Sequence, residues 1–397
     1  MDLLSKIKAL NEKYAKEVVD MRRHIHSHPE LSYQEFDTSA YVARQLKSYG
    51  ITPREGVATT GVVATIAGRN AEKKLVALRA DMDALPITEE NEVSYKSTNP
   101  GVMHACGHDV HTSSLLGTAR ILQDIRDSFE GTVRLIFQPG EEKNPGGASY
   151  MIMEGVLQNP APSSIIGQHV FPLLPVGKIG FREGMYMASS DEIYLRIIGR
   201  GGHGAAPDLA VDPIVVASHI IIALQQIVSR NASPRQPAVL TFGRIIGNGA
   251  TNIIPNEVNI AGTFRAMDEK WRMDALHKIK KMAEHVAEGM GARCEVELSS
   301  GYPFLKNDPS LTQRIRSAAE EYVGRENVVE LDITMGSEDF AYYSQLVPAS
   351  FYRLGTRNEA KGITSFVHTP TFDIDEDALS IGPGLMAWMA VKELKES

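Results

Sequence analysis

The sequence contains little cysteine, no run of basic residues and no apolar segment of membrane-spanning length. Its 397 residues include only two cysteines, Cys106 and Cys294, too few for a disulfide framework, which favours a cytoplasmic location. The longest nearly unbroken apolar run, residues 213–224, is shorter than the about 20 residues that a transmembrane helix needs. Residues 1–16 mix charged and apolar side chains from the start, so we expect no signal peptide.

Composition and charge exclude several further classes of protein. Hydrophobic residues make up 43% of the chain and charged residues 23%, which is typical of a globular protein and excludes disorder and collagen. Lysine and arginine number 41 against 49 aspartates and glutamates, a net charge of −8. We therefore expect neither nucleic acid nor a membrane as the main partner. The length predicts two or three domains.

Both terminal parts of the chain predict an α/β fold. Short β-branched runs alternate with amphipathic segments, which indicates a mostly parallel sheet with helices on both faces. We assign residues 1–186 and 300–397 to this domain. The predicted strands are at 61–67, 75–80, 132–137, 165–170, 327–331 and 350–354.

The middle of the chain shows a different pattern. Residues 187–299 predict the order strand, helix, strand, strand, helix, strand, which is a split ferredoxin-like arrangement inserted into the larger domain. Asp212 and Asp268 precede the two helices as N-caps. The first helix, 213–228, is apolar nearly all round, so the surplus apolar surface should be buried inside the chain or against a partner.

Three further helix boundaries follow from capping signals. Ser32 and Glu35 fit a capping box for a helix that ends at Gly50. Asp109 is placed to cap the helix that follows the polar stretch 84–102. A helix is also expected at 337–346, and residues 375–395 should form two helices because Gly-Pro-Gly interrupts them.

The strongest chemical signal is the motif Met-His-Ala-Cys-Gly-His-Asp-Val-His at 103–111. Cys106 and His108 lie two residues apart in a turn that Gly107 keeps tight, so both can face one ion. Thiolate and imidazole suit zinc and the later first-row metals. The alternative is a buried thiol beside ordinary loop histidines.

A second signal is the pair Glu141–Glu142 after the strand at 132–137, where sites gather in α/β sheets. One carboxylate can bind a metal while its neighbour faces a water, although a solvated acidic turn is the simpler reading. His169 ends the strand predicted at 165–170, and His368 lies in the segment before the final helices. Each alone is better explained as a core histidine. Each becomes a metal-ligand candidate only together with Cys106, His108 and Glu142.

Five motifs taken together resemble the co-catalytic metallopeptidase family that includes aminoacylase. The most similar branch is that of N-acyl-amino-acid amidohydrolases, hippurate hydrolases and auxin-conjugate hydrolases. The motifs occur in the family's order over essentially the whole chain. They are residues 78–86, 103–111, 138–142, 202–207 and 336–340.

The resemblance implies two divalent ions per chain, with Zn, Mn, Co and Ni all possible. It implies a Cys106 that contacts both ions and a Glu141 that acts as general base. It implies that His108 and His169 bind one ion and that Glu142 and His368 bind the other. This sequence departs from the family's His-x-Asp ligand motif, because Asp81 stands in place of the histidine, and His108 is our candidate replacement.

The inserted domain resembles the family's lid and dimerisation domain. The resemblance implies a homodimer in which His203 reaches the partner's active site. Asn252 and Arg265 are candidate substrate-binding residues, and Arg265 could pair with a carboxylate or form only a surface ion pair.

The implied reaction is hydrolysis of N-acyl-L-amino acids, of the N-acetyl or N-benzoyl type, to a carboxylate and a free amino acid. Two alternatives stay open. One is a dipeptidase or carboxypeptidase that acts on small peptides. The other is a metal-binding scaffold whose site has decayed.

Overall fold

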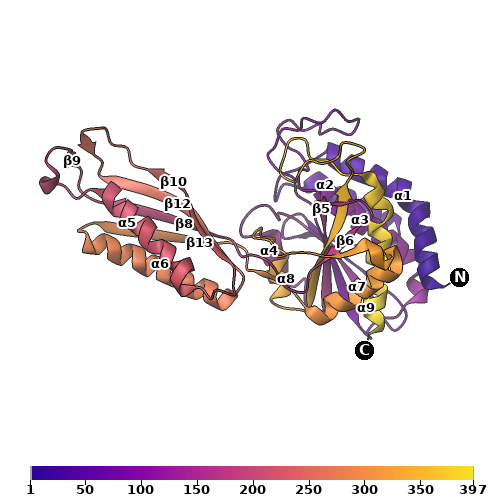
Figure 1. Cartoon of the computed structure of the whole chain (residues 1–397). Helices are drawn as coiled ribbons and strands as arrows, with labels where there is room; N and C mark the ends of the chain where they lie inside the picture. The colour runs from indigo at the N-terminus through magenta and orange to yellow at the C-terminus, as the bar shows by residue number, and fades with distance from the viewer. Residues whose placement is uncertain (1, 397) are drawn as a thin grey trace. The chain divides into compact units, whose positions relative to one another are not determined.

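The computed structural model describes residues 2–396, which form two compact units (Figure 1). Within the described residues, the first unit comprises 2–184, 306–333 and 339–396. The second comprises Met185–Leu305 and the short segment Thr334–Glu338. The predicted mixed α/β fold with a large, mostly parallel sheet is confirmed.

The first unit is built on an eight-stranded sheet in which the four central strands run parallel. Strand β3 is buried along its whole length, because helices cover both faces of the sheet. The strand order is β1 (Arg54–Val57), β2 (Gly61–Ala67), β4 (Thr132–Gln138), β3 (Leu75–Asp81), β5 (Ser164–Pro175), β16 (Ala349–Arg357), β6 (Ile179–Phe181), β15 (Val328–Glu330).

Helices α3 and α9 pack directly on this sheet, and α4 and α8 lie on its other face (Figure 1). Helix α3 is buried on all sides, because α1, α2 and α9 surround it. The helices are α1 (Leu3–Ser27), α2 (Phe36–Ser48), α3 (His108–Asp124), α4 (Gly147–Met153), α7 (Pro309–Val323), α8 (Ala341–Ser344) and α9 (Gly382–Lys395). Short 3-10 turns occur at Arg126–Ser128, Arg325–Asn327 and Glu376–Ser380. Two helical segments therefore end the chain as expected, but they are separated at Ile381, and Gly-Pro-Gly forms the first turn of α9 instead of the break.

The capping box predicted from Ser32 and Glu35 is wrong. Helix α2 begins at Phe36, three residues later than a cap at Ser32 predicts, and the Glu35 side chain makes no capping bond. Instead, the backbone amides of Asp37 and Thr38 donate to the carboxylate of Glu30, at 3.1 and 2.8 Å. The Glu35 carboxylate accepts bonds from distant partners, which outcompete the local cap.

Two other predicted helix boundaries are also wrong. Helix α3 begins at His108 after Gly107, and the Asp109 carboxylate accepts a bond from Arg22 Nε at 2.7 Å rather than from the helix amides. The helix predicted at 337–346 is reduced to the four residues of α8. Just before it, Asp339 accepts bonds from Arg79 and Gln138.

The second unit has the predicted ferredoxin-like order. Its four strands pair antiparallel as β10-β12-β8-β13. Asp212 and Asp268 cap the two helices, with their carboxylates accepting from the amides of Ile214 and Trp271. The elements are β8 (Asp191–Ile198), α5 (Pro213–Gln226), β10 (Ala238–Ile246), β12 (Glu257–Ala266), α6 (Glu269–Gly289) and β13 (Arg293–Ser300). The smaller elements of the chain are β7 (Gly184–Met187), β9 (Gly202–His203), a 3-10 turn (Pro207–Leu209), a π-helical turn (Ile227–Asn231), β11 (Ile253–Ile254) and β14 (Leu305–Asn307).

Helix α5 carries apolar side chains on both of its faces. One face packs on the four-stranded sheet, whereas Ile214, Val215 and Ile222 are 43%, 48% and 71% exposed. The segment Pro213–Asn231 is long and apolar enough to cross a membrane by length and composition alone, with a mean hydropathy of 1.4 and one third of it buried. One such helix is weak grounds for a membrane span, since core helices of globular proteins pass the same test.

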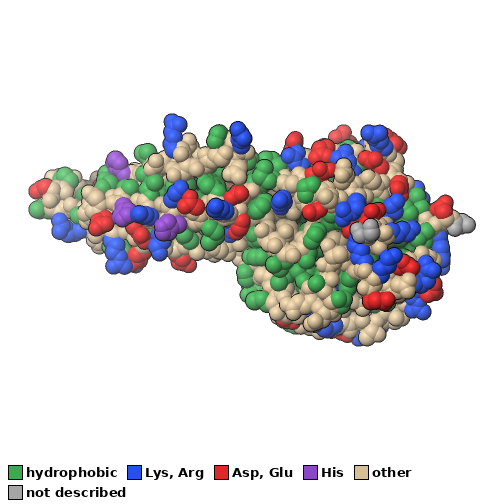
Figure 2. Space-filling model, turned by 90° about the horizontal axis from the view of Figure 1, so that it is seen from below, with side chains coloured by type: hydrophobic (Ala, Val, Ile, Leu, Met, Phe, Trp, Pro, Cys, Tyr) green, Lys and Arg blue, Asp and Glu red, His purple; other side chains and the backbone are tan. Residues whose placement is uncertain are grey.

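Acidic and basic side chains are interspersed over the face of the molecule that Figure 2 shows. This distribution agrees with a net charge of −8 without a basic run. It differs from the concentrated positive surface that binds nucleic acid.

Candidate metal centre

The candidate ligands come from segments that follow or end the central parallel strands. Glu141 and Glu142 follow β4, and His169 lies within β5. Cys106 lies just before α3, and His108 is the first residue of that helix. Parallel strands present their carboxyl ends at one edge of the sheet, so residues far apart in sequence meet there.

The structure brings the five predicted ligands together in two groups that share Cys106. One group is Cys106, His108 and His169, and the other is Cys106, Glu142 and His368; in each, potential ligand atoms lie within 4.8 Å of one another. Cys106 Sγ is 3.4 Å from His169 Nε2, and His368 Nε2 is 3.2 Å from Glu142 Oε1.

The hydrogen bonds of the two histidines in the first group leave one nitrogen of each ring for an ion. His108 Nδ1 lies 3.2 Å from the Asp83 carboxylate, and His169 Nδ1 lies 2.7 Å from the Val170 carbonyl. Both partners only accept, so each Nδ1 carries a hydrogen and each Nε2 faces the site. Burial acts to lower the pKa of His108, but the charge of Asp81 outweighs it and raises that pKa, so His108 Nε2 binds an ion only after losing a proton. Within the described residues, the buried His108 Nε2 makes no hydrogen bond. A divalent ion would satisfy this atom, so the donor set fits a metal.

Asp83 is a functional residue that we did not identify from the sequence. Its Oδ1 accepts from the amide of Glu141 and contacts His108, and its Oδ2 accepts from the amide of Glu142, both amides at 3.0 Å. Ser32 Oγ donates to the same Oδ2 at 2.6 Å. One buried carboxylate therefore orients a candidate ligand and the turn that carries both glutamates.

His111 belongs to the same motif but is already fully bonded. Its Nδ1 lies 2.6 Å from Asp81, and its Nε2 accepts from the amide of Val170 at 2.8 Å. Asp81 also accepts from Arg79. Burial acts to raise the pKa of Asp81, but the charges of His108 and Arg79 outweigh it and hold that pKa well below its ordinary value. Asp81, which stands in place of the family's histidine, therefore fixes the His111 ring, and that ring in turn accepts from the Val170 amide of β5.

Without an ion, protons neutralise part of the cluster. Burial and the charge of Glu142 raise the pKa of the Cys106 thiol. Hydrogen bonds with Cys106 and Glu142 raise the pKa of His368 to about 10. Burial lowers the pKa of His169, which favours its neutral form. The charge of Asp81 likewise outweighs burial and raises the pKa of His108. Since metal ligands must be deprotonated, an ion that binds here displaces protons from Cys106, His108 and His368.

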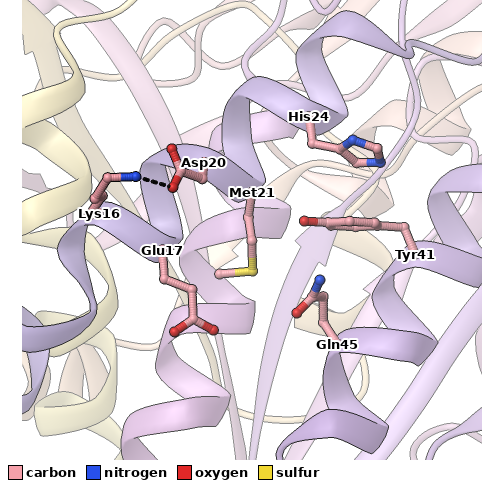
Figure 3. Close-up of a pocket in the computed structure, with 7 residues that line it drawn as sticks. All are labelled: Lys16, Glu17, Asp20, Met21, His24, Tyr41 and Gln45. Atoms are coloured by element: carbon pink, nitrogen blue, oxygen red, sulfur yellow. Dashed lines mark hydrogen bonds and ion pairs between the residues drawn. The ribbon is translucent and has the colours of Figure 1, made fainter.

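Two histidines near the end of α1, His24 and His26, lie in different environments. His26 is buried between Asp109 and Glu89, and Arg22 bonds the same Asp109. His24 instead lines an open hollow of about 450 Å³ between α1 and α2, where its ring stacks on Tyr41 (Figure 3). The hollow contains none of the candidate ligands.

The predicted residues of the second unit lie on two of its strands and in a turn. His203 is exposed on β9, and its Nδ1 accepts from the amide of Ala205. Asn252 is exposed in the turn before β11, and its carbonyl accepts from the amide of Gly204, next to His203. Arg265 on β12 donates to Ser337 Oγ at 3.0 Å, and burial lowers its pKa.

Comparisons with known proteins agree with this geometry. Residues 77–391 match the model of peptidase family M20/M25/M40. The chain is 41% identical to IAA-amino acid hydrolase ILR1-like 4 of Arabidopsis thaliana, covering 96% of this chain and 86% of that protein. It is 39% identical to thermostable carboxypeptidase 2 of Saccharolobus solfataricus, covering 99% of both chains.

Comparison with a solved structure identifies the same family. The crystal structure of a Bacillus subtilis protein, described as a dinuclear metal-binding peptidase of the M20 family, matches with a TM-score of 0.82 at 36% identity. The match covers 97% of this chain and 99% of that one. The chain thus belongs to peptidase family M20/M25/M40 and is a metal-dependent hydrolase of amide or peptide bonds.

Proposed function

We propose that the protein hydrolyses N-acyl-L-amino acids, of the N-acetyl or N-benzoyl type, to a carboxylate and a free amino acid. The observation that carries the proposal is the pair of groups sharing Cys106, with Glu141 beside His108 and Glu142. Cys106, His108 and His169 would hold one divalent ion, and Cys106, Glu142 and His368 the other. When bound, two such ions polarise an amide carbonyl and acidify a water.

Glu141 acts as the general base in this proposal. It is buried, and the Asp83 carboxylate holds its backbone amide. Its side chain takes a proton from the attacking water and delivers it to the leaving amine nitrogen as the C–N bond breaks. The water oxygen ends in the new carboxylate, so the two products are an acid and an amine.

The second unit supplies substrate contacts and the dimer interface. Arg265 would pair with the free carboxylate of the amino acid, and Asn252 and His203 would donate hydrogen bonds to the substrate. The exposed apolar face of α5 would be covered by a second copy in a two-fold homodimer, with His203 acting on the partner's substrate.

We also propose a cytoplasmic location, on the grounds of the two distant cysteines.

The proposed dimer interface can be tested by introducing a charged residue on the exposed apolar face of α5. Ile222→Glu should yield a monomer by light scattering, because a carboxylate cannot be buried unpaired in an apolar interface. Met273→Glu is the matched control, since Met273 is an exposed apolar residue of the other helix, α6. If the wild type is monomeric while active, the dimer proposal fails.

A carboxypeptidase or dipeptidase activity is the second candidate, and the Saccharolobus relative favours it. A screen of N-acetyl, N-benzoyl and dipeptide substrates with added Zn, Mn, Co or Ni distinguishes the two. The first proposal expects the highest kcat/KM on an N-acyl amino acid. Faster turnover of peptides with a free amino terminus would replace it with the second.

A further inference from the structure

The loop between α1 and α2 lies against the turn that carries Glu141 and Glu142. Neither the family motifs we used nor the proposed mechanism gives this loop a role. Two of its side chains contact the turn at Gly140, and a third contacts Asp83, the carboxylate that accepts from the next two amides of the turn.

The first contact is made by Glu35. This residue is fully buried, and its Oε1 accepts from the amide of Gly140 at 2.8 Å. Its Oε2 accepts from Thr60 Oγ at 2.7 Å, and Thr60 is also buried. Three consecutive amides of the turn, at residues 140–142, therefore donate to buried carboxylates: the first to Glu35 and the next two to Asp83.

The other two contacts come from Ser32 and Tyr33. Ser32 Oγ donates to Asp83, so the loop also holds the carboxylate that orients the turn. The Tyr33 ring packs directly on Gly140, where an added Cβ would lie 2.5 Å from a ring carbon. Gly140 has a φ of 59°, so glycine is required there for conformation as well as for space. Tyr33 itself has a φ of 65°, which persists in a bulky residue only where its surroundings fix it.

We propose that residues 32–35 form a positioning loop for the catalytic turn, with Glu35 as its main positioning residue. The proposal rests on the proposed function for its effect on turnover. Glu35 does not belong to either ligand group, so it acts through the backbone of Gly140. Because Glu141 is next in the chain, release of the Gly140 amide lets the base move away from the attacking water.

The expected kinetic effect separates positioning from binding. Glu35→Ala should lower kcat about 10- to 100-fold, since a displacement of about 1 Å can cost that much. KM and metal content should stay within about twofold, because Glu35 contacts neither substrate nor ion. Glu35→Gln should restore most of kcat: its amide oxygen can accept from Gly140, and the Thr60 hydroxyl can reverse and accept from the amide nitrogen.

Glu30→Ala is the matched control. Glu30 belongs to the same segment but caps α2 through Asp37 and Thr38. Its loss should lower the melting temperature and leave kcat unchanged. Ser32→Ala provides a second, milder variant if Glu35→Ala does not fold, and it should lower kcat about threefold to tenfold while metal content holds.

Hydrogen exchange of the metal-free protein tests the loop independently of turnover. In Glu35→Ala or Ser32→Ala, a peptide covering residues 139–143 should exchange about tenfold faster, whereas Glu30→Ala should affect only α2. Unchanged exchange at 139–143 in the folded variants overturns the proposal, as does an equal kcat loss in Glu30→Ala. If the wild type hydrolyses no N-acyl amino acid, the proposed function fails, while the exchange comparison still decides the role of the loop.

Discussion

The two units hold most of their candidate functional residues in opposite ways, although His368 of the first unit is exposed and Arg265 of the second is half-buried. In the first unit, Cys106, His108 and His169 are buried and fixed by hydrogen bonds to one another or to Asp83 and the backbone. In the second unit, His203 and Asn252 are exposed. The contrast indicates that the first unit preorganises most of its ligand set on its own, whereas in our proposal the residues of the second unit act only with a substrate or a partner.

The largest effect is expected from the base within the preorganised site. Glu141→Gln should keep the fold and the metal content, but lower kcat by about 10²- to 10⁴-fold, because an amide cannot accept the proton of water. Steady-state kinetics with metal analysis checks this. Near-wild-type kcat at full metal content would show that another group is the base.

The next largest effect on kcat is expected from His203, an exposed residue of the second unit. His203→Ala should lower kcat on the order of 10²-fold, the typical cost of one donor to developing charge. Mixing its protomers with those of Glu141→Gln should restore about a quarter of wild-type activity, because half of the dimers are mixed and each contains one intact composite site. Mixed dimers that form but remain inactive would contradict a role of His203 across the dimer.

Substitution of Asp83, the carboxylate that orients the ligand His108, should have a smaller effect. Asp83→Asn should weaken metal binding about 10- to 100-fold, the usual cost of losing a ligand's hydrogen-bond partner. Asparagine offers one accepting oxygen where Asp83 offers two, so the amides of Glu141 and Glu142 cannot both be satisfied. Isothermal titration of the metal-free protein measures this. Unchanged affinity would show that the ligand set does not depend on this carboxylate.

The smallest effect is a dependence of stability on pH. Burial, together with the charge of Asp83, raises the pKa of Glu35 to about 7 from 4.5. A raised pKa means that the contribution of Glu35 to stability is complete below pH 4.5 and is lost as the pH rises through 7. Glutamine avoids this loss, so Glu35→Gln should gain on the order of 1–3 kcal/mol relative to wild type between pH 5 and pH 8. Unfolding by denaturant checks this, and a difference that is constant with pH would contradict the raised pKa.

The same contrast explains how much the sequence alone could predict. The strands were found because β-branched runs are bounded by glycine and proline, and the caps Asp212 and Asp268 were found because their partners are two or three residues away. The five ligand candidates lie in motifs, and the structure brings them together.

The residues that sequence reasoning placed wrongly or missed have partners far away in the chain. Glu35 was taken for a helix cap, but it binds an amide 105 residues away. Asp109 was also taken for a cap, yet Arg22, 87 residues away, binds it. Asp83 acts through amides 58 and 59 residues away. A local pattern cannot distinguish a carboxylate that caps its own helix from one that tertiary structure directs elsewhere.

The most direct test of the account is the location of the metals. A crystal soaked with manganese or zinc and measured on both sides of the absorption edge should show two anomalous peaks per chain. Cys106 Sγ should contact both ions, with His108 and His169 completing one and Glu142 and His368 the other. A single peak under saturating metal, or two ions held by other side chains, would contradict the two-ion site on which the proposed function depends.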